Sequence, residues 1–95
     1  MTRIKWLDLA VDDLDDIADY ISQDNPEAAN RIVRRLWTAV RSLADQPEMG
    51  RPGRVYGTRE MVVYDTPFVV PYRVLGTTIE ILRVLHGARD WPKRF

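Results

Sequence analysis

The single histidine of the chain, His86, lies between two arginines, Arg83 three positions before it and Arg89 three positions after it. Histidine is the side chain that exchanges protons near neutral pH. Planar guanidinium groups can stabilise the negative charge that develops on a phosphate during its cleavage. His86, Arg89 and Arg83 are therefore candidate catalytic residues for phosphodiester cleavage, as in a ribonuclease.

A structural role for the same segment is the alternative. A lone histidine at the end of an apolar strand can pack against Leu82 or Val84 and bond a backbone carbonyl group. We expect Trp91 to close the bottom of the core under the helices. The sequence contains no Ser/His/Asp arrangement, no glycine-rich phosphate loop and no set of metal ligands, so we expect no cofactor and no metal site.

The length and composition indicate one domain over residues 1–95. Without cysteine the chain can form neither disulfides nor thiolate metal sites. No apolar run approaches the ~20 residues of a membrane span, and the first residues do not resemble a signal peptide. These features predict a soluble, cytoplasmic protein that does not bind membranes.

The charge is balanced overall but divided along the chain. Residues 1–50 carry six Lys or Arg and ten Asp or Glu, whereas residues 51–95 carry eight and four, so the halves have net charges of −4 and +4. A basic half can attract phosphate or an acidic partner. Arginine-rich surfaces are also common without that role, so the charge alone does not indicate nucleic-acid binding.

Apolar residues at helical spacing predict two consecutive helices. The first covers about residues 8–23. The second begins after Asn25, a good N-cap, with Pro26 as its first residue, and ends before Pro47. Their apolar stripes include Leu14, Ile21, Leu36 and Val40. The short loop between the helices predicts an antiparallel helical hairpin.

Alternating or apolar segments predict strands at residues 3–7, 58–64, 68–74 and 78–85. The close spacing of the last three predicts an antiparallel meander. Pro71 conflicts with a regular strand because it has no N–H, so we expect an edge position, a bulge or a kink there. The expected fold class is α+β, with an N-terminal strand and an antiparallel two-helix hairpin packed on one face of a small antiparallel sheet.

This order of elements, with YRV at residues 72–74 and IEILRVLHGARDW at residues 79–91, resembles the ParE/RelE superfamily of toxins from bacterial type II toxin–antitoxin modules. The likeness covers nearly the whole chain. It implies a compact toxin and a cognate antitoxin protein whose C-terminal segment wraps and neutralises it. Operator DNA would then be contacted only through the antitoxin.

The superfamily divides by target. RelE-like members cut messenger RNA on the ribosome, and ParE-like members block DNA gyrase and lack the ribonuclease residues. Arg89 and His86 match positions found in ribonuclease members. However, Val69 and Val70 stand where an arginine is expected, and only Phe95 ends the chain where a tyrosine would follow. The resemblance therefore favours a gyrase inhibitor.

Each interpretation assigns its own residues. For a gyrase inhibitor the expected target-binding residues are Arg89, Lys93, Arg94, Arg59 and Arg54. For a ribosome-dependent endoribonuclease they are the catalytic candidates named above. A third possibility is a non-toxic binding partner in an autorepressing complex. In all three, we expect the antitoxin to lay an amphipathic helix on Leu14, Ile21, Leu36 and Val40 and to add a strand at the sheet edge.

Overall fold

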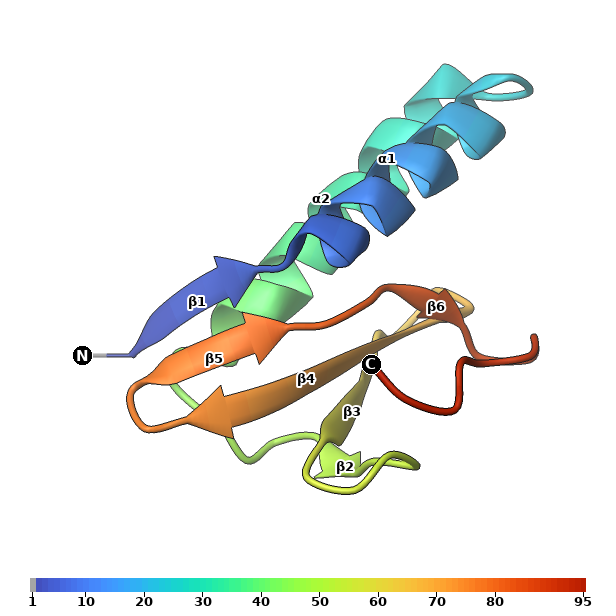
Figure 1. The fold of residues 1–95 in the computed structure, drawn as a ribbon. Helices are drawn as coiled ribbons and strands as arrows, with labels where there is room; N and C mark the ends of the chain where they lie inside the picture. Colours follow the sequence, from blue (N-terminus) through green and yellow to red (C-terminus); the bar gives the residue numbers. More distant parts are fainter. Residues whose placement is uncertain (1) are drawn as a thin grey trace.

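The computed structural model describes residues 2–95, and they form two helices beside a six-stranded sheet (Figure 1). In chain order the elements are β1 (Arg3–Trp6), α1 (Asp8–Ser22), α2 (Pro26–Ser42), β2 (Arg51–Pro52), β3 (Arg59–Val62), β4 (Phe68–Leu75), β5 (Thr78–Ile81) and β6 (Leu85–His86). The predicted α+β class is confirmed. Neither helix in the described part of the chain has the length and apolar character needed to cross a membrane.

The helical hairpin turns where its capping residues predict. The Asn25 side chain accepts a hydrogen bond from the backbone N–H of Ala28 at 3.0 Å, and Pro26 is the first residue of α2. The two helices lie side by side over one face of the sheet (Figure 1). The core between these layers includes Ala10, Leu14, Leu36, Val40, Leu43, Val70, Tyr72, Ile79 and Ile81.

The strand order is β1-β5-β4-β3-β2, and β3, β4 and β5 form the predicted antiparallel meander. The N-terminal strand differs from the expected all-antiparallel sheet. β1 pairs in parallel with β5, from Arg3 opposite Thr78 to Trp6 opposite Ile81. Parallel neighbours need a long connection rather than a tight turn. The helical hairpin and the other strands supply that connection here, so the sheet is mixed.

The strand predicted at residues 78–85 is interrupted. β5 ends at Ile81, which lies opposite Tyr72, and pairing with β4 resumes where Leu85 lies opposite Val69. Three residues, 82–84, therefore face two residues of β4. This is a β-bulge, which bends the strand and changes the direction of its side chains.

Pro71 lies on β4 directly opposite the bulge. Its carbonyl oxygen accepts the backbone N–H of Leu82 at 2.9 Å, and the N–H that proline lacks would point to the same side. β4 has neighbours on both sides, so the edge position considered for Pro71 is wrong. The bulge lies in the neighbouring strand opposite Pro71, not at Pro71 itself, which pairs regularly with Glu60 of β3. Proline is tolerated in this central strand because the pairing is already interrupted there.

The loop before the sheet is fastened to the core by Tyr72. This side chain is fully buried, and its hydroxyl donates to the carbonyl oxygen of Pro47 at 2.7 Å and accepts from the N–H of Gly50 at 2.8 Å. A Cβ atom at Gly50 would lie 2.7 Å from the Tyr72 ring, so no larger residue fits there. Burial raises the pKa of Tyr72 above its ordinary value.

Candidate functional site

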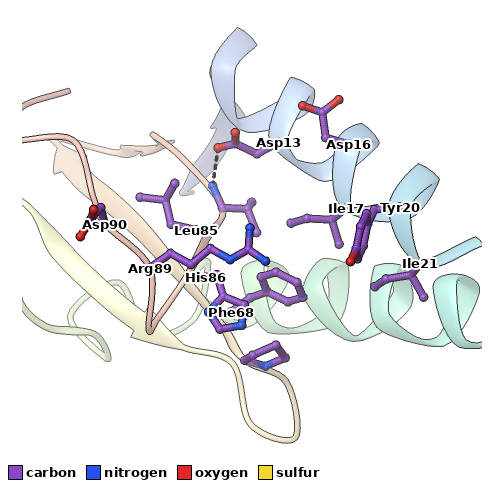
Figure 2. A pocket seen from close by; sticks show the side chains of 12 residues that line it. Asp13, Asp16, Ile17, Tyr20, Ile21, Phe68, Leu85, His86, Arg89 and Asp90 are labelled. Carbon is purple, nitrogen blue, oxygen red and sulfur yellow. Dashed lines mark hydrogen bonds between the residues drawn. The ribbon is translucent and has the colours of Figure 1, made fainter.

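A groove of about 610 Å³ lies between the second half of α1 and β6 (Figure 2). Its apolar lining comes from Ile17, Ile21, Phe68, Val84 and Leu85. Carboxylates of Asp13, Asp16 and Asp90 and the side chains of His86 and Arg89 also line it. The groove therefore combines an apolar surface with charges of both signs, and it contains two of the three predicted catalytic residues.

His86 is held by local contacts in this groove. Its ring meets Phe68 edge-on, with centroids 5.9 Å apart and an interplanar angle of 82°. Its Nδ1 atom accepts the backbone N–H of Ala88 at 3.2 Å. In the alternative structural role, His86 would bond a backbone carbonyl group, whereas within residues 2–95 its imidazole accepts a bond from an N–H group.

Arg83 does not line the groove that contains His86 and Arg89, which corrects the expected three-residue cluster. Its Nε and Nη2 atoms donate to the two carboxylate oxygens of Asp13 at 2.7 and 2.9 Å. These bonds raise the pKa of Arg83 above its ordinary value. The bulge directs Arg83 into a separate pocket, shared with Arg94 and Phe95. The guanidinium is therefore neutralised by Asp13, a carboxylate at the edge of the groove.

Two further arginines of the sheet are also satisfied within the chain. Arg59, a predicted target-binding residue, donates from Nη1 to the carbonyl oxygens of Glu48 at 3.3 Å and Gly50 at 2.9 Å. Arg73 donates from Nε to Glu80 at 2.6 Å. Neither side chain lines the groove that contains His86, so neither supplies a cation there.

A buried carboxylate organises the loop between β2 and β3. Glu60 is only 3% exposed, and it accepts from the Arg51 guanidinium at 3.1 and 3.2 Å and from the backbone N–H of Arg54 at 2.7 Å. The Arg54 guanidinium lies 3.7 Å from the centre of the Trp91 ring. The expectation that Trp91 closes the core under the helices is wrong, because this ring lies against Arg54 on the β2–β3 loop and is not part of the core cluster.

The C-terminal segment, defined here as residues 87–95, carries the remaining predicted target-binding residues. Arg89, Lys93 and Arg94 are exposed, and within residues 2–95 they form no ion pair. This segment therefore offers three cationic side chains to a partner.

The residues predicted to bind the antitoxin fall into two groups. Leu14, Leu36 and Val40 are buried in the core with at most 8% exposure, so a partner cannot contact them in this fold. Ile21 is partly exposed and lines the groove of Figure 2. The apolar stripes of the two helices are buried in the core. The apolar surface that a partner can reach is the groove beside them.

A family model described as "ParE toxin of type II toxin-antitoxin system, parDE" matches residues 4–91. The chain belongs to this family. As a ParE-family toxin of a type II module, it has a cognate antitoxin as a partner, and the superfamily resemblance is confirmed.

Individual relatives support the same assignment. The chain is 47% identical over 91 residues to "Putative toxin Y4kP" of Sinorhizobium fredii, covering 96% of this chain and 94% of that protein. It is 43% identical over 89 residues to "Toxin RelE2" of Caulobacter vibrioides, covering 94% and 99%. A solved structure described as "Chromosomal ParDE TA system from P. aeruginosa" superposes with a TM-score of 0.79 at 37% identity, covering 88% of this chain and 94% of that one.

The two valines on β4 have packing roles in this ParE-family toxin. Val70 is fully buried in the core beneath the helices, and Val69 is 5% exposed and pairs with Leu85. An arginine at either position would have to bury its charge. The fold therefore holds apolar side chains where the resemblance places an arginine of the ribonuclease members.

Proposed function

We propose that this ParE-family toxin inhibits DNA gyrase by binding it and thereby blocks replication. The supporting observation is that Arg59, Arg73 and Arg83 are all bonded within the chain. Phosphodiester cleavage requires cationic donors and a proton-transfer group around the same phosphate, and each lost donor costs ~3 kcal/mol of transition-state stabilisation. A binding function makes no such demand.

The proposed contact surface for gyrase is the C-terminal segment, with Arg89, Lys93 and Arg94. These cations are free to pair with carboxylates of a partner, and such pairs steer association and select the partner. Arg54 is a secondary contact because half of its side chain is exposed. Arg59 is removed from the proposed surface, since its guanidinium fastens the loop before β3.

The first experiment separates the targets in cells. DNA and protein synthesis are followed by pulse-labelling within minutes of inducing the toxin without antitoxin. We expect DNA synthesis to fall first, and purified toxin to block supercoiling by gyrase. An earlier fall in protein synthesis would contradict the proposal, and unchanged growth would favour the non-toxic binding partner.

A matched pair of variants then tests the contact surface. Replacing Lys93 and Arg94 by alanine should raise the toxin concentration needed to inhibit supercoiling by about tenfold, because about 1.4 kcal/mol of interaction corresponds to a tenfold change. Replacing Arg31 and Arg34, two exposed arginines on α2, removes the same charge elsewhere and should leave inhibition unchanged. Equal effects of the two variants would indicate a general charge effect.

A ribosome-dependent endoribonuclease is the second candidate, because His86 and Arg89 share one groove and a relative bears the name RelE2. Purified ribosomes with a defined messenger RNA provide the test. Cleavage that requires both His86 and Arg89 would establish this activity, and intact transcripts at toxin concentrations that block gyrase would eliminate it.

For the antitoxin, the groove of Figure 2 is the proposed docking surface. It is largely apolar, with carboxylates at Asp13, Asp16 and Asp90 and a cation at Arg89. An amphipathic antitoxin helix can insert apolar side chains beside Ile21 and pair its charged residues with these groups. This replaces the predicted contacts with Leu14, Leu36 and Val40, which are buried.

A further inference from the structure

The C-terminal segment has no regular secondary structure, so its position depends on individual contacts. Figure 1 shows it in red beyond β6, on the side of the sheet away from the helices. Its first residues are held by backbone bonds. The N–H of Gly87 donates to the carbonyl oxygen of Pro67, before β4, at 2.8 Å, and the N–H of Arg89 donates to that of His86 at 3.2 Å. Residues 90–95 make none of these backbone–backbone hydrogen bonds within residues 2–95.

Within residues 2–95, Trp91 makes the polar contacts that hold residues 91–95. Its indole Nε1 donates to the carbonyl oxygen of His86 at 3.0 Å, five residues earlier. Its ring lies under the Arg54 guanidinium at 3.7 Å. The first contact is local, so the second is the one that connects Trp91 to a distant part of the fold. Arg94 and Phe95 line a pocket with Arg83 but form no hydrogen bond or ion pair within residues 2–95.

The Arg54 side chain is itself fixed by the buried carboxylate of Glu60. The Arg54 Nε atom lies 3.6 Å from Glu60 Oε2, and the same oxygen accepts the Arg54 backbone N–H at 2.7 Å. Glu60 also pairs with Arg51, but the guanidinium that lies over the Trp91 ring is that of Arg54. Glu60 thus holds the Arg54 guanidinium independently of Trp91. The guanidinium then interacts with the aromatic face as a cation.

We propose that Arg54 and Trp91 are positioning residues, which hold the C-terminal segment so that Lys93 and Arg94 meet an acidic surface of the target together. A fixed segment loses less conformational freedom on binding, and long cationic side chains gain most from such preorganisation. The choice of gyrase as that target rests on the proposed function. The positioning of the segment does not.

The first test measures the position of the segment without any target. Trypsin cleaves after Arg89, Lys93 and Arg94, and it should do so faster when the segment is released from Arg54. Intact-mass spectrometry follows the loss of the C-terminal residues. We expect Arg54→Gln to speed this cleavage at least about fivefold, since proteolysis follows the population of the open form. Arg51→Gln is the matched control, because it removes the other cation paired with Glu60 and leaves the contact with Trp91.

Two further variants separate positioning from general loss of structure. Arg54→Lys keeps the cation and should restore most of the protection, whereas Trp91→Ala should behave like Arg54→Gln. Thermal unfolding must show that each variant is folded at the temperature of the assay. Equal cleavage rates in Arg54→Gln, Arg51→Gln and the unchanged toxin would overturn the positioning role.

The second test connects the position to the function. Trp91→Ala, which keeps the Arg54 cation, should raise the toxin concentration that half-inhibits gyrase about tenfold, with Arg51→Gln near the unchanged toxin. Faster proteolysis with unchanged inhibition would overturn the idea that positioning serves target binding. If the unchanged toxin does not inhibit gyrase but the proteolysis difference is present, the proposed function fails and the positioning role stands.

Discussion

Asp13 on α1 accepts two hydrogen bonds from the Arg83 guanidinium, at 2.7 and 2.9 Å, and a third from the backbone N–H of Val84 at 2.9 Å. The Asp13 and Arg83 side chains are only 15% and 23% exposed. The pair joins the helical hairpin to the bulge at which the last strand is interrupted. One carboxylate thereby satisfies the backbone donor that the bulge releases and neutralises the cation beside it.

Removing this carboxylate should destabilise the toxin. Asp13→Ala leaves the Arg83 guanidinium and the Val84 N–H without their partner, and we expect a loss of about 2–3 kcal/mol in the free energy of unfolding. Asp12→Ala is the control, because Asp12 is exposed on the same helix, and a change within about 0.5 kcal/mol is expected there. Urea denaturation measures both, and similar losses in the two variants would contradict this role.

Replacing Tyr72 by phenylalanine tests how the loop before β3 is fastened. Tyr72→Phe removes the bonds to Pro47 and Gly50 while keeping the ring, and it should cost about 1–3 kcal/mol of stability. Chemical denaturation at neutral pH provides the measurement. A change below about 0.5 kcal/mol would show that these hydrogen bonds contribute little.

The same tyrosine predicts a loss of stability at alkaline pH. Burial raises the pKa of folded Tyr72 above 10.0, so the unfolded chain releases the phenolic proton first as the pH rises. The stability contributed by Tyr72 is fully present below pH 10 and falls as the pH rises through the folded pKa. The unchanged toxin should therefore lose stability above pH 10 more steeply than Tyr72→Phe, and parallel curves would refute the assignment.

His86→Ala should leave gyrase inhibition within about twofold of the unchanged toxin, provided the variant is folded. The imidazole packs edge-on against Phe68 and accepts the N–H of Ala88, whereas the proposed target contacts are made by the cations of Arg89, Lys93 and Arg94. Inhibition of supercoiling is compared at equal concentrations of folded protein. Complete loss of inhibition in a folded variant would require a direct role for His86.

Two exposed tyrosines provide a test of the antitoxin groove. Tyr20 is 72% exposed and lines the groove, and Tyr64 is 78% exposed and lies outside it. Tyrosines at protein interfaces often contribute more than about 1 kcal/mol, so Tyr20→Ala should weaken antitoxin binding about fivefold or more. Tyr64→Ala should have little effect in the same titration calorimetry. A larger effect of Tyr64→Ala would place the antitoxin elsewhere.

Local signals in the sequence predicted the helices well. The expected helix over residues 8–23 is observed as Asp8–Ser22, and α2 begins at Pro26 after the Asn25 cap. The caps and the apolar period act within a few residues, so they can be recognised without knowledge of the fold. The interruption after Ile81 was missed because it depends on β4 and on Asp13, which are distant in sequence.

The site was predicted less completely, for a related reason. Arg83 appeared close to His86 in sequence, but its partner Asp13 lies 70 residues away. One signal did exist. Asp13 is the acidic residue placed four positions before Ile17 and three after Ala10, so it shares the apolar face of α1. A carboxylate on such a face needs a partner. For Glu60 and Trp91, no comparable local pattern was present.

The parallel pairing of β1 with β5 has a consequence for the time course of synthesis. Residues 3 and 78 must meet before the sheet is complete, whereas the helical hairpin can form from neighbouring residues alone. At about 5–20 residues per second, the roughly 40 residues between the ends of α2 and β5 take about 2–8 s to emerge from a ribosome. During those seconds the apolar stripes of the nascent hairpin have no sheet to cover them, so a newly made chain passes through an aggregation-prone stage before it becomes a folded toxin.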